Sequence, residues 1–258
     1  MIANYHTHTT RCHHARGTER EYIEQALANG IKILGFSDHS IQIMDRPGAQ
    51  NHRMAPEEIA DYCQVLEALR SEYAGRIQLH IGFEMEYYPR FFRNTMNYMK
   101  EYPIEYLILG QHFLGNEDGG YTGAPTEDEK ILAQYVDQTL EGLYTGAFTY
   151  FAHPDLIAYR GPDPIYTRHI TRLCETAKQL QIPLEVNVLG LETKRCYPRD
   201  RFWEIASEVG CDAVIGCDAH DVHYVGNPEF VCNARQYLAR FGITPLEQIP
   251  LRDPFRSL

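Results

Sequence analysis

Seven short apolar runs in this 258-residue sequence each end on side chains that can bind a metal ion or hold a substrate. These side chains are His6 and His8, Asp38 and His39, Glu84, His112, His153, Asn187, and Asp218 and His220. Side chains that meet in one place must come from equivalent positions of repeated units. A ring of parallel strands meets this requirement, because the C-terminal ends of its strands lie at one mouth of the barrel. The pattern therefore predicts a β/α barrel with a polynuclear metal centre in its mouth.

The types and spacing of these residues point to bound divalent metals. Side chains of an extended segment alternate between two faces, so His6 and His8 share a face and can chelate one ion. Asp218 and His220 also share a face and are spaced to contact two different ions. A mixture of imidazole and carboxylate ligands favours zinc, manganese or iron over magnesium or calcium. One such histidine alone is more often structural, but the whole set is hard to explain as packing, because unpaired buried polar groups cost several kcal/mol.

Amphipathic segments at helical spacing separate the apolar runs. We predict strands near residues 2–5, 33–36, 78–82, 106–109, 149–152, 184–187 and 213–216. Thr18 and Glu21 form a capping box for the first helix, which Gly30 ends. Alternating strands and helices favour parallel pairing with right-handed crossovers. Seven strands are evident and an eighth is not, so we predict one α/β barrel domain over residues 1–258, with segments 40–55 and 113–126 as walls of its mouth.

Composition limits the classes of function. The formal net charge of −11 disfavours nucleic-acid binding, which needs a basic face. The seven cysteines include no CxxC pair, which indicates reduced thiols in the cytoplasm rather than disulfides. Neither a signal peptide nor an apolar run of about 18 residues is evident, so we expect no membrane association. Pairing of chains into a homo-oligomer through the helical exterior stays open.

Eight motifs follow one another in a distinctive order along almost the whole chain. They are Tyr5-His6-Thr7-His8-Thr9, Cys12-His13-His14-Ala15, Gly35-Phe36-Ser37-Asp38-His39, Gly82-Phe83-Glu84-Met85-Glu86-Tyr87, Gly110-Gln111-His112-Phe113-Leu114-Gly115, His153-Pro154-Asp155-Leu156, Glu185-Val186-Asn187 and Gly216-Cys217-Asp218-Ala219-His220. In type and order they resemble the PHP (polymerase and histidinol phosphatase) superfamily, most closely its stand-alone histidinol-phosphatase branch.

The resemblance implies a distorted seven-stranded, TIM-like barrel with two or three divalent ions at its C-terminal face. By this resemblance one metal would be held by His6, His8, Glu84 and Asp218, a second by Glu84, His112 and His153, and a third by His14, His39 and His220. It favours His14 over the adjacent His13. It also implies that Glu84, Asp218 and His220 take part directly in catalysis.

The sequence departs from the family after the sixth strand, where Glu192 occupies the position of an arginine that would face phosphate. Lys194 and Arg195 follow immediately. We predict that the substrate contacts are Arg160, Asn187, Lys194 and Arg195, and that Arg46 and Arg53 are weaker candidates. Asp155 is predicted either to help protonate the leaving alkoxide or to orient a ligand histidine.

The expected reaction is metal-assisted hydrolysis of a phosphate monoester. Two adjacent divalent ions lower the pKa of a shared water and so supply a bridging hydroxide as nucleophile. The resemblance implies that the small phosphorylated substrate is L-histidinol phosphate, cleaved to L-histidinol and phosphate in histidine biosynthesis. The alternatives are a nucleotide or phosphotyrosine as substrate, a metal-dependent amidohydrolase, and a non-catalytic metal-binding module. The complete set of ligand types argues against the last of these.

Overall fold

The computed structural model describes residues 1–45 and 52–256. Seven parallel strands are hydrogen-bonded in chain order from β1 to β7. Their bounds are β1 Ala3–Asn4, β2 Ile33–His39, β3 Gln78–Met85, β4 Tyr106–Leu109, β5 Phe148–Phe151, β6 Leu184–Asn187 and β7 Ala213–Gly216. The seven-stranded, TIM-like α/β barrel predicted from the sequence is confirmed.

The first and last strands meet at the mouth of the barrel. Just beyond β1 and β7, Thr7 and Ala219 form a parallel bridge, and the His8 N–H donates to Ala219 O at 3.0 Å. At the opposite end, the Leu246 N–H donates to Ala213 O at 2.8 Å, so the C-terminal segment lies beside β7. The closure at the mouth places the two segments that follow β1 and β7 side by side.

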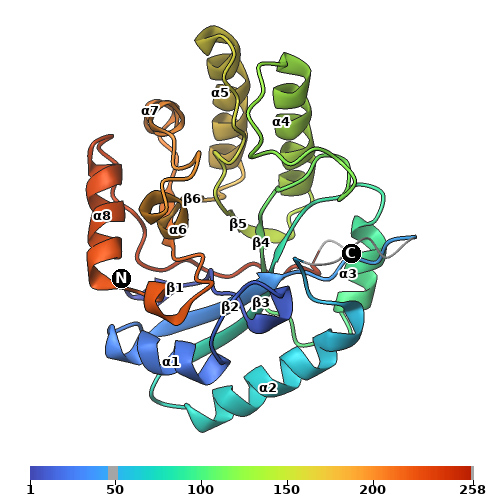
Figure 1. Ribbon diagram of the computed structural model, residues 1–258, viewed down its shortest axis with the longest axis vertical. Helices are drawn as coiled ribbons and strands as arrows, with labels where there is room; N and C mark the ends of the chain where they lie inside the picture. The colour runs from blue at the N-terminus through green and yellow to red at the C-terminus, as the bar shows by residue number, and fades with distance from the viewer. Residues whose placement is uncertain (46–51, 257–258) are drawn as a thin grey trace.

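Helices surround the strands (Figure 1). Their bounds are α1 Glu19–Ala28, α2 Ile59–Glu72, α3 Phe92–Met99, α4 Glu129–Tyr144, α5 Asp163–Gln179, α6 Val188–Glu192, α7 Asp200–Val209 and α8 Pro228–Ala239, with short 3-10 turns η1 Thr10–Cys12, η2 Pro56–Glu58 and η3 Val222–Tyr224. The capping box of Thr18 and Glu21 is present at the start of α1. The sequence does not predict α3 and α6, because helices of 8 and 5 residues are too short to show a clear helical period. Within the described ranges, none of these helices is long and apolar enough to span a membrane.

Strands β2 and β3 extend farther toward the mouth than their apolar runs predict. The two strands stay in register through the pairs Asp38 with Phe83 and His39 with Glu84. The polar side chains interrupt the apolar pattern, but the backbone ladder continues through them. As a result Asp38, His39 and Glu84 lie on the rigid sheet and not on a loop.

A small apolar core fills the inside of the barrel below the mouth. It consists of Ala3, Tyr5, Tyr106, Ile108, Tyr150, Ala152, Val214 and Ile249. The Tyr106 hydroxyl donates to Tyr5 O at 2.8 Å, and its ring covers Gly82, where a Cβ would overlap it. This core closes the barrel below the polar residues of the mouth and excludes water on that side of them.

Candidate metal centre

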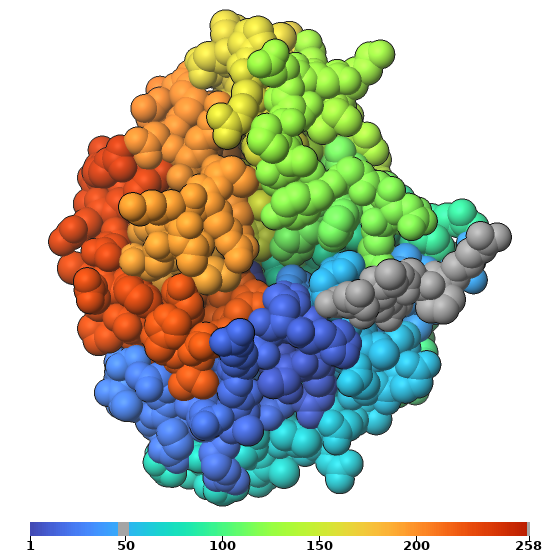
Figure 2. Space-filling view, in the orientation of Figure 1, coloured from blue at the N-terminus to red at the C-terminus, as the bar shows by residue number. Residues whose placement is uncertain are grey.

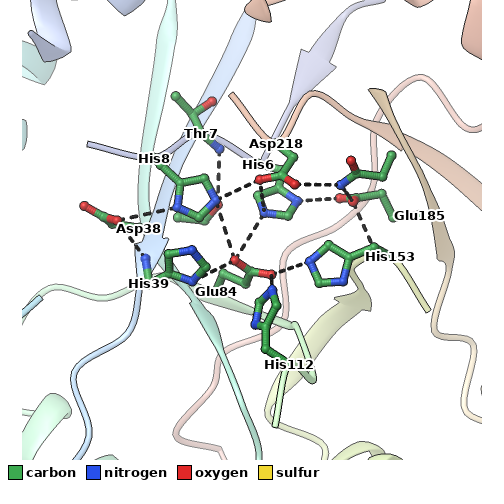
Figure 3. A network of polar contacts seen from close by, with 12 residues as sticks. His6, Thr7, His8, Asp38, His39, Glu84, His112, His153, Glu185 and Asp218 are labelled. Carbon is green, nitrogen blue, oxygen red and sulfur yellow. Dashed lines mark hydrogen bonds and ion pairs between the residues drawn. The ribbon is translucent and has the colours of Figure 1, made fainter. Parts of the chain in front are cut away.

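The structure gathers the nine predicted ligands into one cluster at the mouth. Figure 3 shows all of them except His14 and His220. Period-two alternation aims His6 and His8 inward together after β1, and β3 delivers Glu84 to the centre of the group. His112 and His153 follow β4 and β5, His39 is the last residue of β2, and the remaining members come from the segments after η1 and β7. Residues far apart in the sequence therefore place their ligand atoms within a few ångströms of one another.

The first group of ligand atoms has the spacing of a tetrahedral site. His6 Nε2 lies 3.5 Å from Glu84 Oε2 and 3.5 Å from Asp218 Oδ1. His8 Nε2 lies 3.5 Å from the same Glu84 oxygen and 3.1 Å from the same Asp218 oxygen. Four ligands about 2.0–2.1 Å from one tetrahedral ion are roughly 3.3–3.4 Å apart. The four separations between a histidine nitrogen and a carboxylate oxygen lie close to that value.

The other oxygen of Glu84 faces a second group. Glu84 Oε1 lies 2.7 Å from His153 Nε2 and 3.6 Å from His112 Nε2. Gly110 makes this position possible, because a Cβ there would overlap the Glu84 carboxylate. With one oxygen directed to each group, Glu84 has the geometry of a bridging carboxylate.

Three further histidine rings form the third group. The His14 ring stacks on that of His220 with centroids 4.7 Å apart, and its centroid is 5.2 Å from that of His39. His14 Nδ1 bonds to Cys12 O at 2.7 Å and His220 Nδ1 to Asp218 O at 3.0 Å, which leaves the Nε2 atoms of both rings for another partner.

The neighbouring candidates lie differently. His13 and His14 are both exposed, but His14 places a ligand atom within 4.8 Å of one of His220, which supports the preference for His14. The Cys12 thiol is buried within 4.8 Å of ligand atoms of His14 and His220, a proximity that the sequence does not predict.

Several ligand atoms of the cluster are buried without a hydrogen-bond partner among the described residues. They are His6 Nε2, His8 Nδ1 and Nε2, His39 Nδ1, Glu84 Oε2, His153 Nδ1 and His220 Nε2. Leaving so many polar atoms unsatisfied in one place would be costly. Most of them face the centre of the cluster, so the donor set fits divalent metal ions.

The electrostatics favour ionised carboxylates. Burial raises the pKa of Glu84, but the surrounding histidines, led by His112, outweigh it and hold that pKa well below its usual range. Burial likewise opposes ionisation of Asp218, yet His6 and His220 hold its pKa low. Both carboxylates are therefore available as anionic ligands.

A second layer of buried carboxylates orients the histidines from behind. Glu185 Oε2 lies 2.8 Å from His6 Nδ1, and Glu86 Oε1 lies 2.9 Å from His112 Nδ1. Asp38 Oδ1 lies 3.5 Å from His8 Nδ1, an ion-pair contact without a hydrogen bond. Hydrogen-bonded partners such as Glu185 and Glu86 fix the ring orientation and raise the basicity of a metal-binding histidine. The sequence reasoning missed these roles, although an acidic residue within an apolar strand, such as Glu185, is a signal that could have identified one of them.

Residues 4–188 match the PHP domain family, which is more than half of the chain. The chain belongs to the PHP domain family. Asp218 and His220 lie beyond the matched residues, just after the last strand β7 of the same barrel.

Known PHP relatives cover most of the chain. A probable histidinol-phosphatase of Deinococcus radiodurans is 28% identical over 242 residues, covering 87% of this chain and 88% of that protein. A probable phosphatase of Shewanella pealeana is 25% identical and covers 98% of this chain and 89% of its own length. The fold is similar to that of a histidinol phosphate phosphatase of Lactococcus lactis solved with zinc, L-histidinol and phosphate. The TM-score is 0.72 at 18% identity, over 96% of this chain and 98% of that one.

A cavity of about 310 Å³ opens above the cluster of this PHP domain. Figure 2 shows it as a crevice between the segment around residue 190, in orange, and the segment around residue 120, in green. Beyond five members of the cluster, it is lined by His52, Phe113, Tyr121, Leu189, Arg195 and Tyr197. A cationic guanidinium and several flat rings thus surround the entrance.

Of the predicted substrate contacts, Arg195 lines this cavity, and its Nη1 donates to the Tyr197 hydroxyl at 2.9 Å. Lys194 lies instead on a separate outer cavity beside α8, together with Glu192. Arg160 is exposed and is not part of the lining of the cavity above the cluster. Asn187 lies within the cluster, where its Nδ2 donates to Glu185 at 2.8 Å and to Asp218 at 3.1 Å.

Arg53, one of the two weaker candidates for a substrate contact, does not line the cavity above the cluster. Arg53 is fully buried, and its guanidinium donates to Glu86 Oε2 at 3.0 Å and to Ser40 O at 2.8 Å. It also forms an ion pair with Glu117, so it ties together the walls that follow β2 and β4. Arg46 lies outside the described residues. Arg53 therefore joins the loops behind the cavity through buried ion pairs, and it is not one of the cations that line the cavity.

Proposed function

We propose that this chain is a metal-dependent phosphate monoesterase that hydrolyses L-histidinol phosphate to L-histidinol and phosphate, as a step of histidine biosynthesis. The observation that carries the reaction type is the convergence of unpartnered imidazole and carboxylate atoms around Glu84. The substrate is supported by the histidinol-phosphatase name of a relative that is 28% identical over most of this chain.

The proposed centre holds two or three divalent ions, zinc, manganese or iron. The assignment is His6, His8, Glu84 and Asp218 for the first, Glu84, His112 and His153 for the second, and His14, His39 and His220 for the third. The tetrahedral spacing of the first group supports zinc there. When bound, neighbouring divalent ions lower the pKa of water and take up charge that develops on phosphoryl oxygens.

The residues of the chain would divide the remaining work between them. Arg195 is the cation of the cavity that a phosphate group above the metals would meet, since Lys194 lies on a different surface. Guanidinium groups bind phosphate oxygens with two parallel hydrogen bonds. His52, Phe113 and Tyr121 form a flat-sided wall on which an imidazole-bearing leaving group can pack. Glu192 faces Asn233, 2.9 Å away, so it leaves the phosphate position free.

The whole of residues 1–258 is proposed to form this one catalytic domain. We further propose a cytoplasmic location, because all seven cysteines are free and a reducing compartment preserves them. A nucleic-acid substrate is not expected at a net charge of −11.

The test is phosphate release by zinc- or manganese-loaded protein, with L-histidinol phosphate compared with nucleotides and phosphotyrosine. Preference for L-histidinol phosphate is the expected result. Preference for another ester would keep the reaction and refute the substrate, and turnover of none of them would favour C–N hydrolysis or a binding role. Glu84→Gln should lose both metal and activity, whereas full turnover by that variant would refute the bridging assignment.

A further inference from the structure

Asp155 follows His153 by two residues, yet it faces away from the metal cluster. Its side chain is buried, and it is not among the residues that line the cavity above the cluster. Asp155 Oδ2 accepts a hydrogen bond from the Arg199 backbone N–H at 2.7 Å and one from the Trp203 indole N–H at 3.2 Å. Its partners therefore belong to the start of α7.

The chain just before α7 carries two residues of the cavity. Arg195 donates to the Tyr197 hydroxyl, and the buried Tyr197 ring lies 5.4 Å, centroid to centroid, from the ring of His153. Gly190 permits this packing, because a Cβ at that position would overlap the Tyr197 ring. The position of the guanidinium over the cluster thus depends on where segment 195–199 rests.

Three contacts tie segment 195–199 to the turn that follows β5. The Arg199 guanidinium donates to Tyr159 O at 2.6 Å, and the Cys196 thiol donates to Leu156 O at 3.4 Å. The third contact is the carboxylate of Asp155, and it is the one of these three hydrogen-bonding contacts in which the turn contributes a side chain. Removing the carboxylate would leave the part-buried N–H of Arg199 and the buried indole N–H of Trp203 without this acceptor, which is costly for donors shielded from water.

We propose that Asp155 is a positioning residue that holds segment 195–199 against the turn after β5, and thereby fixes Arg195 over the metal cluster where phosphate would bind. The inference rests on the proposed phosphatase function. It replaces the expectation that Asp155 protonates the leaving group, because the carboxylate is directed to α7 and not to the cavity. Its loss should weaken the binding of phosphate more than the chemical step.

Two substitutions at Asp155 separate the two roles. Asp155→Asn keeps a carbonyl oxygen that can accept both N–H groups but cannot act as an acid, whereas Asp155→Ala removes the acceptor. We expect Asp155→Asn to retain kcat and KM for L-histidinol phosphate within about threefold. Asp155→Ala should raise KM and weaken the binding of inorganic phosphate, measured by calorimetry, by roughly tenfold or more, with unchanged metal content. Trp203→Phe removes the indole N–H and part of the buried ring but keeps the bond from the Arg199 N–H to Asp155, so it should shift KM and phosphate affinity in the same direction by less.

A role as acid gives a different pattern. Asp155→Asn would then lose kcat for L-histidinol phosphate as severely as Asp155→Ala, while both would retain turnover of p-nitrophenyl phosphate, whose leaving group needs no proton. That pattern would overturn the proposal. So would unchanged KM and phosphate affinity in Asp155→Ala and Trp203→Phe.

Tryptophan emission gives a readout that does not depend on activity. Trp203 is the only tryptophan of the chain, and it is fully buried, so Asp155→Ala should shift its emission and Asp155→Asn should not. If the wild-type protein releases phosphate from no ester, the proposed function fails. Phosphate affinity and Trp203 emission would still test the positioning role of Asp155.

Discussion

The imidazole of His6 and the carboxylate of Glu185 form a fully buried pair, with His6 Nδ1 2.8 Å from Glu185 Oε2. An ionised carboxylate accepts a hydrogen bond, so the pair places the histidine proton on Nδ1 and leaves Nε2 free. That free nitrogen is the atom that faces Glu84 and Asp218. Glu185 also accepts from Asn187 and from the backbone N–H of His153, so one carboxylate supports three residues of the cluster.

Substitution of Glu185 should therefore weaken metal binding without abolishing it. Glu185→Gln keeps the size of the side chain and removes the charge that orients His6, and we expect a loss of about 10- to 100-fold in metal affinity. A titration of metal-free protein with zinc and a chromophoric competitor measures it. Glu192→Gln is the control, because Glu192 bonds to Asn233 away from the cluster. Equal affinities in the two variants would contradict the orienting role.

Gly110 tests how closely the sheet must approach the bridging carboxylate. In Gly110→Ala the new methyl group would overlap the Glu84 carboxylate, so the carboxylate must move or the sheet must shift. Overpacking of this kind costs about 1–3 kcal/mol, and here it also misplaces Glu84. We expect a lower bound-metal content, measured by elemental mass spectrometry, and a lower melting temperature. Gly120→Ala is the matched control, since a Cβ there meets no atom within 4 Å; metal loss equal in both variants would refute the argument.

Arg53 is expected to stabilise the protein from behind the cavity. Arg53→Met would leave Glu86 buried without its guanidinium partner, and breaking a buried ion pair in this way costs about 3–5 kcal/mol. Denaturant unfolding measures the change. Arg90→Met removes the exposed ion pair with Asp45, for which about 0–1 kcal/mol is expected. If Arg53→Met lowers the free energy of unfolding no more than Arg90→Met does, the ion pairs of Arg53 do not stabilise the protein as proposed.

The fold and the strand-end residues of the cluster follow from local rules in the sequence, whereas His14 is expected only from the family resemblance. Apolar runs separated by amphipathic helices require parallel strands, and period two aims His6 and His8 to one side. Strand-end residues have little freedom once the sheet forms. The assembly of Glu84 with His112 and His153 therefore follows from topology alone.

The residues around the cluster are harder to predict because their positions depend on packing between distant segments. Arg160 and Arg195 look equivalent in the sequence, but only Arg195 lines the cavity, since segment 195–199 rests on the turn after β5. In the sequence, Arg53 stands in a polar loop and looks like a surface cation. In the structure, it is paired with Glu86 and Glu117. Hydrogen bonds across such separations carry no local sequence signal.

Arg195 should control substrate affinity while its neighbour does not. Arg195→Ala removes charge-assisted hydrogen bonds worth about 1.5–3 kcal/mol, so we expect KM for the phosphate ester to rise by roughly 10- to 150-fold. Lys194→Ala, on the outer surface beside α8, should change KM by less than about twofold. Steady-state kinetics with both variants tests the difference. An equal rise in the two would mean that net charge near the mouth, and not a specific contact, determines affinity.

Removal of metal should lower the stability of the protein, because the cluster then holds one oxygen of Glu84 and several imidazole nitrogens buried without partners among the described residues. An ion present at 1,000 times its Kd stabilises the folded state by about 4 kcal/mol. For a chain of this size that is a melting temperature roughly 8–16 °C higher. Scanning calorimetry of chelator-treated protein, before and after zinc is restored, measures the shift.

The shift in melting temperature should shrink as the pH is lowered, because histidine must be neutral to bind metal. It should nearly vanish in Glu84→Gln and persist in His80→Ala, since His80 contacts Gln78 and Glu105 at the other end of β3. A shift of equal size in Glu84→Gln and wild type would place the stabilising metal outside this cluster.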